Sequence, residues 1–503
     1  MAGGRPLIVA GMALVMAACS SAPAGRGLAQ DAVAAMGGAD ALRGVQTLVM
    51  RGGEGTRSRI GQTLRAGDAH GTAMLANVVE TVDLAGGRAA LDYEVTTPSG
   101  FFQHRQEVLT SKDGAGVGLE RVDERPLAVM SPSGLFSWGT QNSPEFLLRR
   151  NVVTVALAAA DTAAEGPPQE GELDGRTLPS TAATLPSGQS ATVFFDPDTG
   201  LLAGYEVLDT ESMLGDVTAQ YIFGDYRAVD GLTLPHRITV RKDGQPYSEV
   251  QFASVAVDEA VALEVFAIPD EAQAEVDRAL AAGEYSMVEI SRVADGVYFA
   301  RMYSHNSLIV EFPEWLAVVE AAYTNAQSHS LARALAEQFP DKPIRYAAVT
   351  HHHYDHSGGI RGMAAHGATI LAARGHEPEL RPILEAPHTA PADMLAMKRQ
   401  AGEPVGTLEL FDERYVLSDG GQTLELYAVT GSPHAEPVVL AYVPGARLLF
   451  QSDLFFPGTG GGNSPAATHL LESVRDLGLR VTTHVGGHGG VAPFDELVKA
   501  VGS

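Results

Sequence analysis

Four histidines and one aspartate are concentrated in the six residues from His351 to His356. A strand-like segment precedes them, and two glycines at 358–359 allow the chain to turn into a helix. Imidazole and carboxylate groups at this density are typical ligands of zinc and other first-row metal ions. The run therefore predicts a metal site at the end of a strand, with His351 and His353 facing one ion and Asp355 and His356 facing a second.

The chain around this run alternates short strands with helices, which indicates a layered α/β architecture. A helix is expected at 328–339. The strands are expected at 288–293, 297–302, 308–312, 316–320 and 344–350.

The pattern His-x-His-x-Asp-His at the end of a strand resembles the signature of the metallo-β-lactamase superfamily. The family's later ligand positions are matched in order by His434 after Gly431-Ser432-Pro433, by Asp453 after a strand, and by His488 in a glycine-rich turn. The resemblance covers residues 285–503 and implies an αββα sandwich. It implies the following ligands: His351, His353 and His434 for one ion, Asp355, His356 and His488 for the other, and Asp453 as the bridge. It also implies two Zn²⁺ ions per chain, with iron or manganese as alternatives.

Several nearby residues are interpreted separately. The side chain of His352 should leave the site, and Tyr354 is expected to pack. His484 competes with His488 as the last ligand, although only His488 has the glycine context. His305 and the neighbouring asparagine lie at a strand start. They are interpreted as turn contacts, and the alternative is that they line the edge of the pocket. Glu320 occupies a supporting position at which many family members have aspartate, so the support of the site is expected to differ.

The resemblance implies a metal-dependent hydrolase acting on a small molecule. A hydroxide bridging the two ions would attack an ester, lactone, thioester or amide, and Asp355 would orient it and move its proton. A bridging Asp453 resembles the hydrolases related to glyoxalase II and phosphodiesterases. True β-lactamases generally lack this bridge, so a true β-lactamase is an alternative and not the first choice. An iron-dependent redox member is a further alternative, disfavoured because no flavin-binding segment follows.

The first half of the chain, residues 30–268, favours strands with period-2 alternation and turn signals. A short helix is expected at 29–42, and an exposed loop or hinge at 157–187, which is rich in Ala, Pro, Gly and acidic residues. The half loosely resembles periplasmic lipoprotein carriers, which fold one curved antiparallel sheet around a hydrophobic cavity. This gives a second functional hypothesis, a lipid- or hydrophobic-ligand-binding envelope lipoprotein with a subordinate metal domain. The strands are expected at 47–51, 89–96, 190–195, 202–208, 216–226, 232–241 and 248–255.

The first 18 residues combine Arg5 with a short apolar run and small residues, which is typical of an export signal. Met16-Ala17-Ala18-Cys19 resembles a lipoprotein signal, in which Cys19 would become the acylated first residue. The resemblance implies a membrane anchor and a location on the periplasmic side of the envelope, at the outer membrane. The alternative is an export signal without lipidation.

The chain has 503 residues, which exceeds one ordinary core, and a formal net charge of −26, which disfavours nucleic acid as a partner. The oligomeric state is left open. The expected fold class is α+β multidomain, with an antiparallel, half-barrel-like β domain before a metallo-β-lactamase αββα sandwich. The expected boundaries are 1–18 signal, 19–29 tether, 30–268 β-rich domain, 269–284 linker helix and 285–503 hydrolase domain.

Overall fold

The computed structural model describes most of the chain outside its N-terminal signal region. The signal at 1–18, Cys19 with its proposed lipidation, and the linker helix at 269–284 lie outside the described residues, so these remain predictions. In the part that is described, no helix is both long and apolar enough to cross a membrane. The described residues are 25–58, 71–98, 100, 102–112, 115–122, 125–130, 151–211, 213–267, 288–302, 305–321, 324–389 and 392–502.

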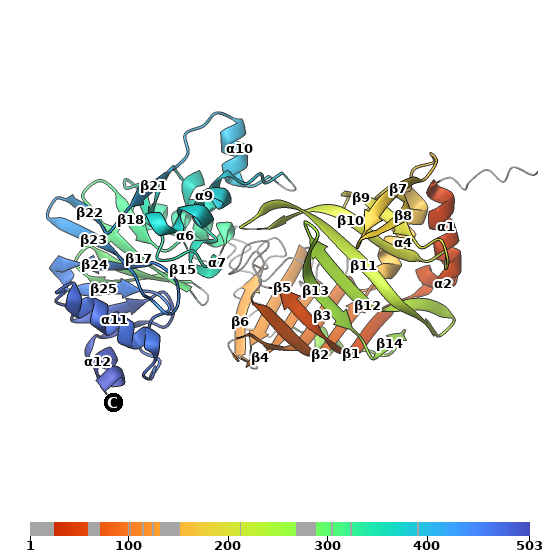
Figure 1. Cartoon of the computed structure of the whole chain (residues 1–503), viewed down its shortest axis with the longest axis horizontal. Coiled ribbons are helices and arrows are strands. Elements are labelled where there is room, and N and C mark those ends of the chain that lie inside the picture. The colour runs from red at the N-terminus through yellow and green to blue at the C-terminus, as the bar shows by residue number, and fades with distance from the viewer. Residues whose placement is uncertain are drawn as a thin grey trace, which may run out of the picture.

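The N-terminal domain is built on one 14-stranded antiparallel sheet (Figure 1). Its strand order is β6-β5-β4-β3-β2-β1-β13-β12-β11-β10-β9-β8-β7, and β14 pairs with β1. Strands β1 to β6 pair in sequence order, as do strands β7 to β13, and the pairing of β1 with β13 joins these two halves of the sheet. The strands are β1 Thr47–Ser58, β2 Thr72–Asp83, β3 Arg88–Thr96, β4 Phe102–Lys112, β5 Ala115–Val122, β6 Arg125–Met130, β7 Gln169–Leu173, β8 Arg176–Thr184, β9 Ser190–Phe195, β10 Leu202–Glu211, β11 Gly215–Val229, β12 Leu232–Lys242, β13 Gln245–Gln251 and β14 Ser254–Val257.

Helices α1 Gly25–Ala35, α2 Ala39–Gly44 and α4 Val152–Thr162 pack on this sheet. Their apolar side chains share one core with the sheet, a feature that the period-2 alternation predicts. The single helix expected at 29–42 is instead two helices. Gly37 and Gly38 separate them with φ angles of 124° and 98°, which only glycine adopts without strain.

The loop or hinge expected at 157–187 is wrong. This segment completes α4 and forms the β7–β8 hairpin. Asn151 caps the helix by accepting a hydrogen bond from the Val153 backbone, and the following alanines favour helix. Asp174 and Gly175, with φ angles of 51° and 73°, make the tight hairpin turn. Composition alone suggested a loop, but an Asp-Gly turn between two strands was the stronger signal.

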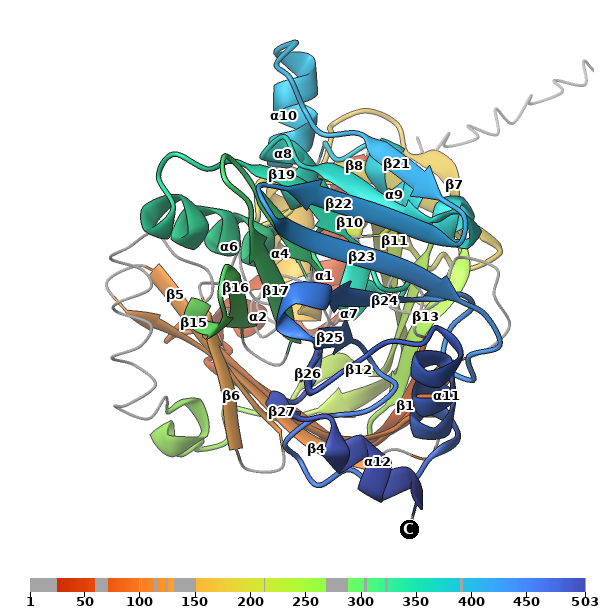
Figure 2. The same cartoon turned by 90° about the vertical axis from the view of Figure 1, so that its left-hand side faces the viewer.

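The C-terminal domain is an αββα sandwich, as the sequence predicted (Figures 1 and 2). One sheet has the order β15-β16-β17-β18-β19-β20-β21 and the other β22-β23-β24-β25-β26-β27. The strands are β15 Val288–Ala294, β16 Val297–Met302, β17 His305–Glu311, β18 Leu316–Val319, β19 Ile344–Ala348, β20 Thr369–Ala373, β21 Leu408–Phe411, β22 Arg414–Asp419, β23 Gln422–Val429, β24 Val438–Val443, β25 Leu448–Gln451, β26 Thr483–Gly486 and β27 Val491–Pro493. The helices are α6 Asn325–Gln338, α7 Tyr354–Ser357, α8 Ile360–Ala365, α9 Glu377–Glu385, α10 Met394–Gln400, α11 Pro465–Asp476 and α12 Asp495–Gly502.

Three apolar layers hold this sandwich together. The central layer fills the space between the two sheets, with Phe299 and Leu308 from one sheet and Leu426 and Phe450 from the other. The two outer layers pack α6, α8 and α9 on the first sheet and α11 and α12 on the second. Because β18 and β19 are parallel neighbours, their carboxyl ends meet at one edge, where the histidine-rich run begins.

Candidate metal centre

The histidine-rich run follows β19 and turns directly into α7. His353 accepts hydrogen bonds at its backbone oxygen from the backbone nitrogens of His356 and Ser357, and the Ser357 hydroxyl donates to the same oxygen. Gly359 then lies so close to α6 that a Cβ there would be 2.2 Å from the Ser328 hydroxyl and 2.8 Å from the Ala321 oxygen. The glycine predicted to turn the chain is thus required by this close approach.

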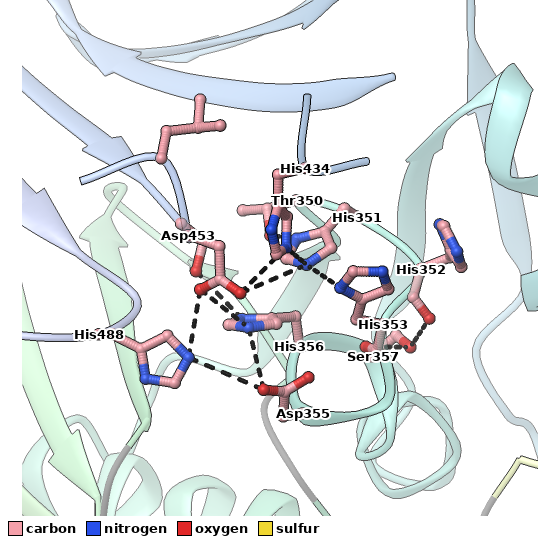
Figure 3. A network of polar contacts seen from close by, with 12 residues as sticks. Thr350, His351, His352, His353, Asp355, His356, Ser357, His434, Asp453 and His488 are labelled. Atoms are coloured by element: carbon pink, nitrogen blue, oxygen red, sulfur yellow. Dashed lines mark hydrogen bonds and ion pairs between the residues drawn. The ribbon is translucent and has the colours of Figure 1, made fainter. Parts of the chain in front are cut away.

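The first group of converging donors contains His351, His353, His434 and Asp453. One ligand atom from each lies within 4.8 Å of the others. His351 Nε2 is 3.1 Å from His353 Nδ1 and 3.2 Å from His434 Nε2. The Oδ2 atom of Asp453 is 3.0 Å from His434 Nε2 (Figure 3). These residues come from the loops after β19, β23 and β25, so the fold brings distant segments to one point.

The second group contains Asp355, His356, His488 and His305. Asp355 Oδ2 is 3.4 Å from His356 Nε2, 3.8 Å from His488 Nε2 and 3.2 Å from His305 Nε2. The Oδ1 atom of Asp453 is 3.2 Å from both His356 Nε2 and His488 Nε2. Asp453 therefore turns one carboxylate oxygen to each group, as expected of a bridging ligand.

The electrostatics of the cluster suit metal binding. Burial, reinforced by His356 and His353, holds the pKa of His351 well below its usual range. Burial and the neighbouring His434 lower the pKa of His353 to about 3. Burial opposes ionisation of Asp453, but His356 and His434 keep its pKa well below the usual range. Neutral imidazoles beside ionised carboxylates are the ligand forms that metal ions require.

Two buried atoms test whether a cation fits. His356 Nε2 and Asp453 Oδ1 lie 3.2 Å apart, but neither atom makes a hydrogen bond of acceptable geometry within the described part of the chain. Burial opposes protonation of His356, but Asp453, Glu320 and Asp355 together raise its pKa well above the usual range, so the site demands a positive charge there. A buried polar atom without a hydrogen bond is costly unless an ion or water satisfies it. A divalent cation between the carboxylates and imidazoles meets that demand, so the residues fit the implied metal.

Glu320 supports the site from the end of β18. Its two oxygens are each 3.1 Å from His356 Nδ1, and one accepts a 2.5 Å hydrogen bond from the Thr350 hydroxyl. The residue is buried and has a φ angle of 73°. Asp453 has a φ angle of 64°, so Glu320 and Asp453 both have a left-handed backbone conformation. Such strain is typical of functional positions. The expectation that Glu320 supports a ligand agrees with these contacts.

Replacement of Glu320 by Gln is expected to weaken metal binding about 10- to 100-fold, the effect typical of losing a group that orients a ligand histidine. The amide keeps the shape but loses the charge that faces His356 Nδ1. Competition between the protein and a chelator for Zn²⁺ measures the change. Glu314→Gln, at an exposed turn of the same domain, is the matched control. Equal affinities for the two variants would contradict a supporting role for Glu320.

The structure separates the remaining candidates. His352 points away from the cluster (Figure 3), and its ring lies 5.4 Å from that of His376. Tyr354 is buried in an apolar core, as expected of a packing residue. His484 lies between the rings of Phe455 and Phe494 and belongs to neither group of donors. Of the two histidines considered for the last ligand position, His488 is the one that lies in the cluster.

The interpretation of His305 as a turn contact is wrong. Its ring is buried and lies 4.2 Å from the ring of His488. The side chain of the next residue, Asn306, donates hydrogen bonds to the backbone oxygens of Gly486 and Gly489. These bonds stabilise the turn that carries His488. A sequence signal existed. The polar run His305-Asn306-Ser307 opens a strand whose residues are nearly all buried, and buried polar residues at a strand start often belong to a site.

The histidines of the N-terminal domain show structural roles where they are described. His104 Nε2 is 2.8 Å from Asp92, and His236 Nδ1 is 3.2 Å from the Leu234 backbone oxygen. Both contacts are typical of surface or core histidines that have no role in a site. His70 lies outside the described residues.

Residues 301–492 match the family model of the metallo-beta-lactamase superfamily. One relative, the 2,4-dinitroanisole O-demethylase subunit alpha of Nocardioides sp. (strain JS1661), is 26% identical over 199 residues, or 39% of this chain and 54% of the relative. The chain thus spans about half the length of that relative.

The solved structures to which this chain is similar include two metallo-beta-lactamases and one alkylsulfatase. A metallo-beta-lactamase from Pontibacter korlensis is 17% identical, with 43% of this chain and 98% of that chain covered and a TM-score of 0.33. The enzyme from Hirschia baltica is 21% identical, with 42% and 96% covered and a TM-score of 0.32. A stereoselective inverting sec-alkylsulfatase from Pseudomonas sp. is 17% identical, with 43% and 40% covered and a TM-score of 0.32.

Proposed function

We propose that this protein is a metal-dependent hydrolase with two divalent ions at its histidine–aspartate cluster, because residues 301–492 match the family model of the metallo-beta-lactamase superfamily. His351, His353 and His434 would hold one ion, and Asp355, His356 and His488 the other. The observation that carries the proposal is the carboxylate of Asp453. Its two oxygens face the two groups of donors, within 3.2 Å of an imidazole nitrogen in each.

Bound divalent ions would supply Lewis acidity toward a carbonyl oxygen and lower the pKa of water, so that a nucleophile exists near neutral pH. The protein's own groups determine where protons go. Asp355 is kept ionised because His356 and a hydrogen bond from His305 outweigh the effect of burial on its pKa. With Oδ2 fixed between three imidazoles, Asp355 can accept a proton and later release it to a leaving group.

Metal content and substrate turnover together test the proposal. The purified protein, loaded with Zn²⁺, Mn²⁺ or Fe²⁺, is assayed against a lactone, a thioester, an aryl ester, an amide and a phosphodiester. Nitrocefin tests the β-lactamase alternative, and 2,4-dinitroanisole tests the reaction in the name of the 26% identical relative. We expect about two ions per chain and metal-dependent cleavage of a carbonyl substrate. Absence of both metal and turnover would overturn the proposal.

The second hypothesis, a hydrophobic-ligand carrier, requires a large apolar cavity in the N-terminal domain. Among the described residues of that domain, one cavity lies between the sheet and the start of α4, and Leu48, Val82 and Ile238 contribute to its lining. It holds only about 20 Å³, close to the volume needed for one water molecule. Where the domain is described, its packed core therefore favours the hydrolase over the carrier.

A further inference from the structure

The tip of the β10–β11 hairpin reaches from the N-terminal domain to the C-terminal domain (Figure 1). Met213, in the turn, is only 8% exposed and belongs to the apolar cluster of the C-terminal domain that contains Leu380, Ile383 and Leu384 of α9. A methionine from one domain is thus part of the core of the other. Burial of such a side chain stabilises the contact by an amount comparable to a core residue.

Polar contacts fix the hairpin to the residues after α9, which we term the acceptor loop (residues 386–389). The Asp216 backbone nitrogen donates to the Pro387 oxygen at 2.8 Å. The Asp216 carboxylate accepts from the Thr389 backbone nitrogen at 2.8 Å and from its hydroxyl at 2.6 Å. Hydrogen bonds to a charged acceptor are stronger than neutral ones. Asp216 accepts two of these and donates a third, neutral bond, and together they define the orientation of the loop.

The two backbones also approach each other closely. Gly215 has a φ angle of 79°, and a Cβ on it would lie 2.4 Å from the Pro387 oxygen and 2.7 Å from the Ala386 side chain. Only glycine permits both the conformation and the approach. On the strand before the turn, the Thr210 hydroxyl is 3.3 Å from His388 Nδ1. The contacts of the hairpin therefore extend over the whole acceptor loop, residues 386–389.

The acceptor loop is connected in turn to the metal-bearing segment by Arg361 of α8. The Arg361 guanidinium is buried and donates to the backbone oxygens of Ile383, Leu384 and Ala386 at 2.9–3.0 Å. It also binds the Asp393 carboxylate at 2.6 and 3.0 Å. Arg361 follows the candidate ligand His356 by five residues. The end of α9, the acceptor loop and the ligand-bearing α7–α8 segment are therefore joined by one buried cation.

We propose that the β10–β11 hairpin is a positioning element of the proposed hydrolase, which holds the acceptor loop and, through Arg361, the α7–α8 segment. The inference rests on the proposed function for its effect on turnover, but the physical coupling is independent of any substrate. Asp216 acts as a positioning residue, since it touches the acceptor loop and none of the candidate ligands. The N-terminal domain is then required for full activity of the C-terminal domain.

Hydrogen–deuterium exchange of the metal-loaded full chain tests the coupling. Asp216→Ala removes the acceptor for both Thr389 hydrogen bonds and is expected to accelerate exchange in residues 386–389 about tenfold. Exchange in residues 354–365 should also rise, and turnover of the panel substrate cleaved fastest should fall about tenfold through kcat. Asp216→Asn keeps one acceptor and should restore part of the effect. Asp198→Ala, in the exposed turn at the other end of β10, is the matched control and should change neither.

Thr389→Val, which removes the hydroxyl from the other side, provides a second route if Asp216→Ala is poorly folded. Combined with Asp216→Ala it should add little, because both changes break the same contact. Unchanged exchange in residues 386–389 would overturn docking by the hairpin. Faster exchange there with unchanged exchange in residues 354–365 would overturn the coupling to the metal-bearing segment. Because exchange needs no substrate, failure of the proposed function would appear separately, as absent turnover with the exchange changes intact.

Discussion

Replacement of His351 by alanine is expected to remove at least one bound metal ion per chain and to lower turnover by about 10³-fold or more. The side chain is fully buried, and its Nε2 atom lies at hydrogen-bond distance from the donor nitrogens of both His353 and His434. Metal analysis of the purified protein, together with turnover of the panel substrate cleaved fastest, measures both effects.

The adjacent histidine provides a matched control. His352→Ala removes an imidazole from the same loop, but that ring points away from the cluster (Figure 3). Metal content should therefore be unchanged and turnover nearly so. Equal loss of metal in the two variants would mean that the loop as a whole, and not His351 as a ligand, governs binding. Full metal content in His351→Ala would contradict the assignment of the first group.

The histidine-rich run was predictable because its chemistry is local. Ligands within a few residues of each other at the end of a strand can converge without any long-range contact, and the alternation of side chains along the run already separates His352 from His351 and His353 (Figure 3). His434, Asp453 and His488 came from the resemblance to a family, not from spacing. Their convergence depends on three separate strands ending at one edge, and only a known fold supplies that information from sequence.

His305 could be proposed from the sequence as a residue at the edge of the pocket, but its place within the cluster could not be predicted. It has no partner in the motif, and it enters the cluster because β17 begins at the same edge as the turn after β26. That juxtaposition results from the backbone hydrogen bond between Asn306 and Gly487, which is a tertiary contact between residues 181 positions apart by their numbers. The misread segment 157–187 has a different cause, since composition was weighed above the Asp174-Gly175 turn.

The N-terminal domain shows a further limit on predicting a fold from its sequence. Period-2 alternation predicted most of its strands after residue 189, and hairpin pairing follows from the short turns between them. The pairing of β1 with β13, which joins the two halves of the sheet, is non-local and leaves no signal in either strand. Nor does the sequence indicate that the β10–β11 turn crosses to the other domain. From the sequence alone, Met213 cannot be distinguished from any other apolar residue in a turn, because the residues that it contacts lie in α9 of the other domain.

Replacement of Asp355 by alanine is the change that most directly tests the chemistry. Its carboxylate is kept ionised and lies 3.2–3.8 Å from three imidazole nitrogens. Loss of the charge should weaken binding at the second group, and loss of the proton acceptor should lower kcat about 10²- to 10⁴-fold even when metal is supplied in excess. Metal titration and turnover at saturating metal separate the two contributions.

Asp341→Ala, at an exposed turn before β19, is the control for removing one negative charge from this acidic domain. If Asp355→Ala left both metal content and turnover unchanged, Asp355 would be neither ligand nor proton acceptor. If metal fell but turnover recovered fully at saturating metal, Asp355 would act only as a ligand. The residual proton transfer would then be assigned to another group, and Asp453, whose two oxygens already face both sets of imidazoles, is the carboxylate nearest to that role.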